Sequence, residues 1–442
     1  MEKLQKWGLV SAIVGLAFIA PGARSSADET AVSPADAIVE RIDDDELRSL
    51  LTEVLERNPE IAVLRAKIAS SGEREVAVRK LPDPRAELTA FVLPPETRVG
   101  PQRFAARVTQ QLPGGGKLEK SARVAQAERR ALSSQLEALR LDLVTRARRL
   151  LIELAYLDEA RRVLDDDHAT LSHFEELARA RYASGAGLQM DAVQLQAEMT
   201  RLEARATEID ERQAGVAADL NRLRDRPGAP LPSLVVDPNA PDDLDWRALG
   251  QIAFASRPEL AADDARIEQA SVRTELASED KSPDFSVGLT YAYVDRRTDV
   301  DVPHNGRDVL GLSGGISIPL WRKGTDAEVE AATQSRIARE AERRATVTTV
   351  ERELEDLRGR LPEIARRLHL MSDVLPVQAE QSFASAEAAY AAGRVDALSL
   401  LDTERVLLDV RLSGARARAD LAIALVDLED AIAAPLPKGD PS

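Results

Sequence analysis

The same ordered set of residues occurs twice along the chain, and this duplication constrains the fold more than any other feature. In each half a Pro-Glu pair opens a helical stretch, a proline and an aspartate precede two alternating segments, and a Tyr-x-x-Gly sequence ends a long helical run. The copies are offset by 199 residues at the first two landmarks and by 206 and 208 at the later ones. A constant order with one abrupt shift indicates two copies of one unit, with an insertion in a variable loop of the second. The paired landmarks are Pro59 and Pro258, Pro84 and Pro283, Pro113 and Pro319, Tyr182 and Tyr390, and Gly185 and Gly393.

Each copy is predicted to contain a helix, a strand, a loop, a strand, a very long helix, a turn and a helix. The first long helix has no proline and would extend about 100 Å at 1.5 Å per residue. Pro362 and Pro376 interrupt the second one, where we expect kinks or a break. The predicted strands are about 85–93, 102–112, 284–295 and 309–320, and the predicted long helices are about 117–184, 187–225, 325–391 and 395–433. The predicted divisions are a signal peptide at 1–27, a first repeat at 28–245, a second repeat at 246–434 and a tail at 435–442.

The short segments of the second copy alternate between large apolar and small polar residues. Large apolar side chains take every second position from Phe285 to Tyr293, and the run from Leu310 to Leu320 alternates in the same way. This period of two suits a strand with lipid on one side and water on the other. The first copy carries charges at alternate positions, which fits a wet lumen. A soluble hairpin with one buried face is the alternative.

The number of strands bears on assembly. Two copies give four strands per chain, which cannot close a barrel, and open strand edges are not stable in lipid. Three chains would supply twelve strands, an even number within the range of outer-membrane barrels. If the strands lie in lipid, we therefore expect a homotrimer.

The composition favours long helices over a compact enzyme. Charged residues make up 30% of the chain and aromatic residues only 3%, a mixture typical of long helices and coiled coils. The net charge of -16 argues against a nucleic-acid-binding surface. There is no cysteine, so the chain has neither a disulfide framework nor a cysteine zinc site.

The first residues have the pattern of a secretory signal peptide. Lys3 and Lys6 give a basic start, an apolar run follows over 9–20, and residues 25–27 are the small residues of a cleavage site. The apolar run is too short to span about 30 Å of hydrocarbon. We therefore expect cleavage after residue 27 and export of the remaining chain.

The sequence contains no recognisable catalytic, cofactor or metal site. The glycines at 114–116 precede Lys117 without the Ser or Thr of a phosphate-binding loop, so they are interpreted as a joint between strand and helix. His168 and His173 are five residues apart and do not share one helical face. The aspartates at 165–167 are interpreted as a solvated helix surface. We expect no enzyme activity, no cofactor and no bound metal.

The ordered double set of landmarks resembles the TolC-type outer-membrane efflux proteins from about residue 47 to residue 433. The resemblance implies an α+β membrane protein, a homotrimeric 12-stranded outer-membrane β-barrel continued by a long periplasmic α-helical barrel. Such a protein is the exit duct of a tripartite efflux system. Its partners are outer-membrane lipid, a periplasmic adaptor (membrane fusion protein) and an inner-membrane transporter, and it passes substrates such as metal cations or drugs.

The resemblance also extends to short motifs. The stretch 110–117 is similar to the Gln-x-x-Pro-x-Pro-Gly-Lys element of the heavy-metal cation efflux subgroup, with Gly115 in place of the second proline. Tips of the family that contact the adaptor match residues 182–191 and 390–399, where a tyrosine of one tip can lock an aspartate of the other. The residues implied at the tips are Tyr182, Gly185, Asp191, Tyr390 and Gly393, and those at an acidic channel constriction are Asp402 and Ser399.

Two other classes of protein share parts of this pattern. A periplasmic coiled-coil adaptor would contain one helical hairpin followed by β-barrel domains, whereas this sequence has two helical halves. A structural coiled coil of the envelope would lack alternating strands with an insertion between them.

Overall fold

The computed structural model describes residues 33–239 and 244–436, and the predicted signal peptide at 1–27 lies outside them. The chain divides into two units, Met1–Ser33 and Pro34–Ser442, and all of the described helices and strands lie in the second. None of these helices combines the length and the apolar character needed to cross a membrane.

Two very long helical runs form the frame of the unit Pro34–Ser442. Helix α4 (Lys117–Ala183) is one unbroken helix of 67 residues, which is about 100 Å long. The corresponding run of the second copy consists of α8 (Arg322–His369), a π-helical turn η2 (Leu370–Val374) and α9 (Leu375–Ala391). Each run is followed by a tight turn and a returning helix. The returning helices are α5 (Gln189–Leu223) and α10 (Ala397–Ile432).

Short helices precede the strands of each copy, and their starts follow from local sequence. The Asp44 carboxylate accepts the backbone N–H groups of Glu46 and Leu47 and so begins one helix, while Asn58 begins the next, with a proline in its first turn. Asp245 begins a helix of the second copy in the same way. These helices are α1 (Pro34–Glu40), α2 (Asp45–Arg57) and α3 (Pro59–Val78) in the first copy, and α6 (Trp246–Ser256) and α7 (Pro258–Glu279) in the second.

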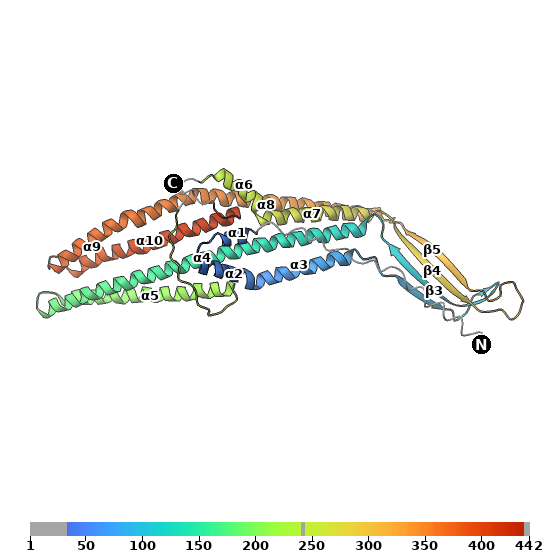
Figure 1. The fold of residues 1–442 in the computed structure, drawn as a ribbon, viewed down its shortest axis with the longest axis horizontal. Coiled ribbons are helices and arrows are strands. Elements are labelled where there is room, and N and C mark those ends of the chain that lie inside the picture. The colour runs from blue at the N-terminus through green and yellow to red at the C-terminus, as the bar shows by residue number, and fades with distance from the viewer. Residues whose placement is uncertain (1–32, 240–243, 437–442) are drawn as a thin grey trace. The chain divides into compact units, whose positions relative to one another are not determined.

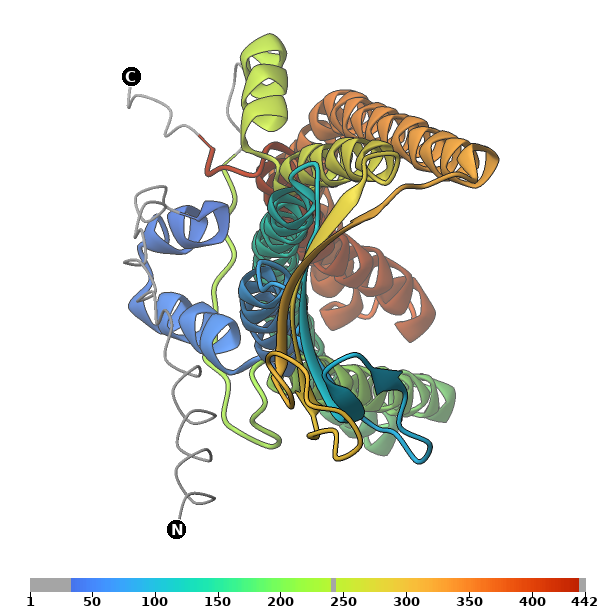
Figure 2. The ribbon, with the colours of Figure 1, turned by 90° about the vertical axis from the view of Figure 1, so that its right-hand side faces the viewer.

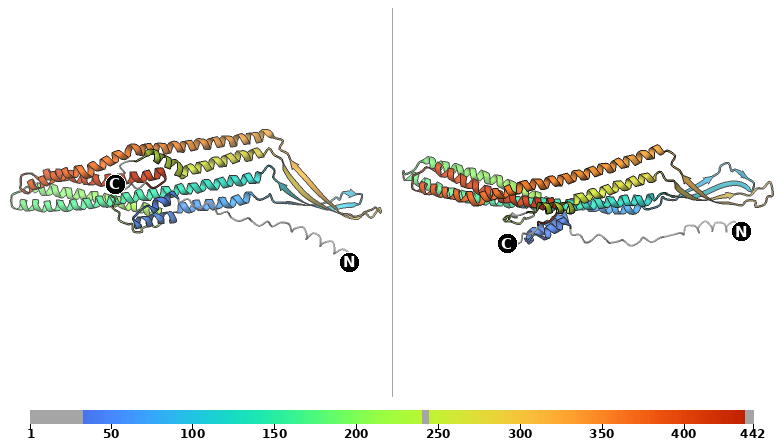
Figure 3. Two further views of the ribbon diagram at one scale, coloured as in Figure 1. Left: turned by 45° about the horizontal axis from the view of Figure 1, so that its top comes forward. Right: turned by 90° about the horizontal axis from the view of Figure 1, so that it is seen from above.

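The helices pack in two sets that share α4. Toward the strands, α3, α4, α7 and α8 lie side by side, and toward the turns, α5, α4, α10 and α9 do so (Figures 1 and 3). Separate apolar clusters fill these sets. One around Leu143 joins α1 and α2 to α4 and α5, and another around Leu400 joins α4, α5 and α10 near the turns. Long helices thus bring residues far apart in sequence into contact.

The second long run departs from regular α-helix between the two prolines at which we expected kinks or a break. The helix continues through Pro362, and the π-helical turn at Leu370–Val374 comes just before Pro376 in the first turn of α9. A π turn releases backbone carbonyl groups from the regular helical pattern. Gly414 of α10 faces this turn, where a Cβ atom would lie only 3.0 Å from the Met371 carbonyl oxygen.

The strands form one antiparallel sheet in the order β1-β3-β4-β5, and β3–β4 is the pairing between the two copies. Figure 2 shows the sheet as a curved layer. Strand β3 leads directly into α4, while α8 follows β5, so the sheet caps one end of the long helices. The strands are β1 (Arg85–Ala90), β2 (Glu96–Thr97), β3 (Gly100–Leu112), β4 (Asp284–Val294) and β5 (Val309–Ser317), with β2 a short pairing at the start of β3 that the sequence pattern does not indicate.

The strand register places the apolar residues of all four long strands on one face of the sheet. Leu88 pairs with Ala106, Val108 pairs with Leu289, and Leu289 pairs with Leu312. Because side chains alternate along a strand, every partner of an apolar residue in these pairs points to the same side. The opposite side carries Arg, Glu, Thr, Ser and Gly. The alternation in the sequence is thus continuous across the boundary between the copies.

Candidate functional site

The apolar face of the sheet is uncovered in the single chain. Leu88, Leu310 and Leu312 are 76%, 70% and 88% exposed. Burying apolar side chains is normally the main stabilising contribution in a folded protein, and contiguous apolar patches on soluble monomers are small. A layer with its large side chains in contact with solvent therefore needs another environment or another chain.

Both outer strands of the sheet have one edge without a partner in the described chain. β1 pairs only with β3, and β5 pairs only with β4. A free edge presents unpaired N–H and C=O groups and can pair with a further strand. The sheet is therefore a segment that can be extended at both ends.

The second face of the sheet is polar and carries charge. Arg85, Glu87 and Arg107 alternate with the apolar residues, and the Arg107 guanidinium donates a hydrogen bond of 3.3 Å to the Thr290 hydroxyl across the strands. Charged side chains on this face and leucines on the other give the sheet two distinct sides. Such a sheet matches a layer between an apolar medium and water.

The two helix turns at the other end of α4 meet each other. Gly185 and Gly393 close α4 and α9 with φ values of 74° and 68°, a left-handed conformation that favours glycine. The Arg181 guanidinium donates a hydrogen bond of 2.6 Å to the Tyr390 carbonyl oxygen and lies 5.3 Å from the centre of the Tyr390 ring. This arginine joins the two copies at their turns.

Tyr390 is buried although it stands at a turn. Its side chain is 1% exposed and packs edge-on against Phe174, with ring centres 6.1 Å apart. Burial and the nearby charge of Asp191 raise the pKa of the Tyr390 hydroxyl. This hydroxyl has no hydrogen-bond partner among the described residues, so the expected Tyr390–Asp191 lock does not take the form of a hydrogen bond in the single chain. Tyr182, the corresponding residue of the first copy, is 51% exposed.

The two predicted constriction residues differ in their surroundings. The Asp402 side chain is 67% exposed, and its carboxylate lies 3.6 Å from the Arg405 guanidinium. Ser399 donates to the Asp396 carboxylate through both its backbone N–H, at 3.0 Å, and its hydroxyl, at 2.7 Å. Ser399 thus helps to form the start of α10, whereas Asp402 offers a carboxylate to solvent.

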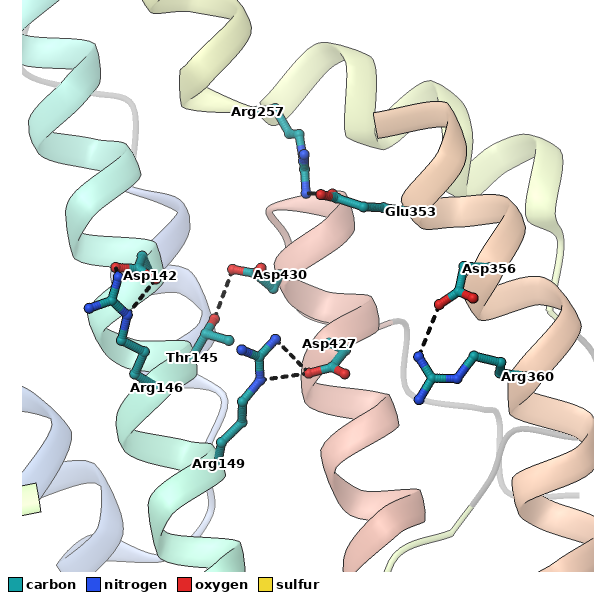
Figure 4. A network of polar contacts seen from close by, with 10 residues as sticks. All are labelled: Asp142, Thr145, Arg146, Arg149, Arg257, Glu353, Asp356, Arg360, Asp427 and Asp430. Carbon is teal, nitrogen blue, oxygen red and sulfur yellow. Dashed lines mark hydrogen bonds and ion pairs between the residues drawn. The ribbon is translucent and has the colours of Figure 1, made fainter. Parts of the chain in front are cut away.

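Ion pairs join α4 to α10 along the middle of the bundle (Figure 4). The Thr145 hydroxyl donates a hydrogen bond of 2.9 Å to the Asp430 carboxylate. The Arg149 guanidinium forms an ion pair of 2.7 Å with the Asp427 carboxylate. Closer to the turns the charges are reversed, because Glu153 of α4 accepts from Arg416 of α10 at 2.5 Å. This seam of opposite charges fixes the register of the two helices.

Residues 249–434 match the model of a family described as outer membrane efflux protein. The match covers most of the second copy, and with the structural likenesses it confirms the resemblance to TolC-type proteins. This family consists of channel proteins and not enzymes, as the sequence predicted. Among curated proteins, no sequence matches the chain.

Solved structures extend the likeness in fold to about nine-tenths of the chain. The outer-membrane channel OprN has a TM-score of 0.76 at 16% identity, with 94% of this chain and 98% of that chain covered. VceC from Vibrio cholerae has a TM-score of 0.75 at 19% identity, with 91% and 99% covered. CusC has a TM-score of 0.74 at 14% identity, with 88% and 92% covered. The predicted α+β fold with an internal duplication is therefore confirmed.

One interpretation from the sequence is wrong for one of its three residues, because Asp165 and Asp166 are exposed as expected but Asp167 is not. The aspartates at 165–167 were expected to form a solvated surface, but Asp167 is only 5% exposed. It lies on the face of α4 that carries Leu164 and Leu171, three residues before and four residues after it, and it packs toward α10. Two further buried acids, Glu198 and Glu404, were not recognised. The sequence did offer one sign of their burial, because each lies at helical spacing from leucines of the buried face.

Proposed function

We propose that this outer membrane efflux protein is the exit duct of a tripartite efflux system. The observation that carries the proposal is a sheet with an uncovered apolar face and two free edges, joined directly to helices about 100 Å long. No packed globular domain needs this combination. A duct needs it, because the sheet can lie in a lipid layer while the helices extend away from it.

The sheet would be completed by two further copies of the chain. The free edge of β5 would pair with β1 of a neighbour, and four long strands from each of three chains would give a barrel of twelve. Closure satisfies the edge groups that lipid cannot. The apolar face around Leu312 would then contact outer-membrane lipid, and the face around Arg107 would line a wet lumen.

The helical part would lie in the periplasm, after removal of a signal peptide at 1–27. The repeats would comprise residues 28–245 and 246–434. Their turns would contact a periplasmic adaptor, which links the duct to an inner-membrane transporter. Residues at or beside these turns are Tyr182, Gly185, Asp191, Tyr390 and Gly393, and Asp402 and Ser399 follow the second turn, where the constriction would form.

The substrates would be small solutes such as metal cations or drugs. A duct of this kind makes few specific contacts, so its residues select weakly between these classes. The similarity of residues 110–117 to the heavy-metal subgroup favours metal cations. A periplasmic adaptor or a structural coiled coil is the alternative, but neither explains the uncovered apolar sheet.

The loop between β4 and β5 gives a test of topology. Its seven extra residues lie between Pro283 and Pro319, and within it the Asn305 side chain exchanges hydrogen bonds of 2.8 and 3.0 Å with the Arg297 backbone. We expect an epitope inserted at Asn305 to be reached by antibody on intact cells. Labelling only after rupture of the outer membrane would reverse the proposed orientation.

The function itself is tested by membrane fractionation and planar-bilayer recording. We expect the protein to stay with the outer membrane after washing with high salt, and the purified protein to form ion-conducting pores. A protein released by salt, with no pore in bilayers, would contradict the proposal and would favour an adaptor.

A further inference from the structure

Besides Glu175, which accepts a hydrogen bond from Gln196 and pairs with Arg179, three acidic side chains are buried between α4, α5 and α10 on the side of the turns. Asp167 and Glu198 are each 5% exposed, and Glu404 is 1% exposed. Buried carboxylates are costly unless each is paired with a cation or hydrogen-bonded. The partners of the three carboxyl groups therefore decide which of them can stay ionised.

Glu198 is the member of this group that is paired with arginines. Its carboxylate lies 2.5 Å from the Arg405 guanidinium of α10 and 2.7 Å from Arg201 of its own helix. Two cations in contact with one buried carboxylate offset the cost of burying its charge. Glu198 and Arg405 thus form a charge-balanced link between α5 and α10.

Asp167 and Glu404 have no such partner. Neither oxygen of the Glu404 carboxyl group meets a hydrogen-bond donor among the described residues. One oxygen of the Asp167 carboxyl group also lacks a donor there. The two carboxyl groups lie against each other across α4 and α10 and are within hydrogen-bonding contact. Two carboxylates cannot hydrogen-bond to each other, so this contact requires that one of them carries a proton.

The apolar surroundings of the Asp167–Glu404 pair favour its protonated form. Leu164, Leu171, Leu400 and Leu408 line the same apolar cluster. Burial, and then the contact with Asp167, raise the pKa of Glu404, and burial raises the pKa of Asp167. The charged groups that face the pair are His168 on α4, Glu198 on α5, and Arg405 and Arg411 on α10, with Arg411 also 3.7 Å from Glu380 of α9.

Other acids of the α4–α10 seam have partners that are not acids: Asp430, whose pKa burial raises, accepts a hydrogen bond from the Thr145 hydroxyl, and two further acids are paired with arginines. Glu153 meets Arg416 at 2.5 Å, and the Glu159 carboxylate accepts from Arg418. Both acids face guanidinium groups that remain charged at any pH of interest. Among the α4–α10 contacts of the described residues named here, the one nearest the turns joins two acids.

We propose that the carboxyl pair of Asp167 and Glu404 is a proton-dependent latch, which holds the first half of α10 against α4 and releases it when the shared proton is lost. The role of such a latch in gating rests on the proposed channel function, because α10 also carries Asp402. Loss of the proton leaves two negative charges inside an apolar cluster, and repulsion and hydration both favour separation of the helices.

The direction of the pH effect follows from proton binding. The closed arrangement binds the proton more tightly than an opened one, in which Glu404 would regain its ordinary pKa. Closure is therefore strongest at low pH, and it weakens as pH rises toward the raised pKa of the pair. In that interval the opening constant increases by up to about tenfold for each pH unit.

Hydrogen–deuterium exchange on the full detergent-solubilised protein tests the latch. Between pH 6 and pH 9, after correction for intrinsic exchange, we expect opening of amides 397–408 to increase by about tenfold or more in the wild type. Glu404→Gln and Asp167→Asn remove the possibility of two facing charges, so their opening should change less than about threefold. Asp409→Asn, a change of an exposed α10 acid, should behave as the wild type, and α7 serves as an internal reference.

Two exchange results would overturn the latch. One is protection of α10 in the wild type that does not change with pH, and the other is an equal loss of protection in wild type and Glu404→Gln. If Glu404→Gln folds poorly, Asp167→Asn provides the same test of the latch, and the reverse also holds.

Bilayer recordings separate the latch from the proposed function. We expect conductance to rise with pH in the wild type and to stay constant in Glu404→Gln. Pores whose conductance does not change with pH would contradict the proposal that the latch gates the channel. A complete absence of pores would contradict the channel function, while the exchange result would still decide whether the latch exists.

Discussion

The sheet and the helical bundle of this protein differ in how far the chain buries their apolar side chains. In the bundle, Leu143 and Leu400 are fully buried by helices of the same chain. In the sheet, Leu310 and Leu312 are 70% and 88% exposed, and each outer strand has one edge without a partner among residues 33–239 and 244–436. The bundle is stabilised within one chain, whereas the apolar face of the sheet is left uncovered by the described part of the same chain.

This contrast indicates where assembly is needed. An isolated chain can keep the clusters of α4, α5 and α10, because the helices satisfy their own backbone groups. It cannot satisfy the edges of β1 and β5. Substitutions in the two regions should therefore differ in whether their effects depend on the membrane.

The largest effect is expected in the bundle core. Leu143→Ala removes a fully buried side chain that packs in the cluster with Leu51 and Leu220, and it should destabilise the protein by about 2–5 kcal/mol. Chemical denaturation monitored by circular dichroism gives the value. Val63→Ala, at a position 52% exposed, is the control and should cost less than about 0.5 kcal/mol. Equal costs at both positions would contradict the assignment of the core.

A nearly equal effect is expected in the sheet, but only in a membrane. Leu312→Arg should cost about 2–4 kcal/mol for each chain when the side chain faces lipid near the bilayer centre. Folding into lipid vesicles followed by denaturant titration measures this cost. Ser313→Arg, on the opposite face of the same strand, should be tolerated. If Ser313→Arg is the more damaging change, the two faces of the sheet have been assigned the wrong way round.

A smaller effect is expected at the turns. Tyr390→Phe removes a hydroxyl that is buried without a hydrogen-bond partner, so it should stabilise the protein by about 1 kcal/mol. Thermal denaturation of the two proteins at one concentration tests this. A loss of stability would mean that the hydroxyl gains a partner in the assembled protein, such as Asp191 in the proposed lock.

The smallest effect on stability is expected at Asp402. Its side chain is 67% exposed, so Asp402→Ala should change stability by less than about 0.5 kcal/mol. Three copies around an axis would nevertheless form a ring of charge that sets ion preference. Bilayer recordings should show block by divalent or trivalent cations in the wild type and its loss in the variant. Asp409→Ala is the matched control, and block that persists in Asp402→Ala would remove this residue from the constriction.

The sequence was most informative where the apolar residues recur with a single clear spacing. Alternation from Phe285 to Tyr293 indicated a strand with two unlike faces, and the strand register of the structure agrees. The ordered prolines and glycines indicated the duplication, because such residues mark helix starts and ends whatever their tertiary surroundings.

The remaining features depend on contacts between distant residues. Helical spacing shows that Asp167 and Glu404 share faces with leucines, but it does not show that these acids meet each other. In the same way, the hydrogen bond from Arg181 to the Tyr390 carbonyl group joins residues 209 positions apart. The close approach of Gly414 in α10 to the Met371 carbonyl group of the π-helical turn is another such contact.

The central claim, that the sheet is completed by copies of the same chain, is tested most directly by the mass of the detergent-purified protein. Light scattering corrected for bound detergent should give three times the mass of the processed chain, which is 48.1 kDa before processing. The trimer should persist on dilution, because closure of the barrel pairs every strand edge. A folded monomer, with the helical and strand content of the wild type, would contradict the account.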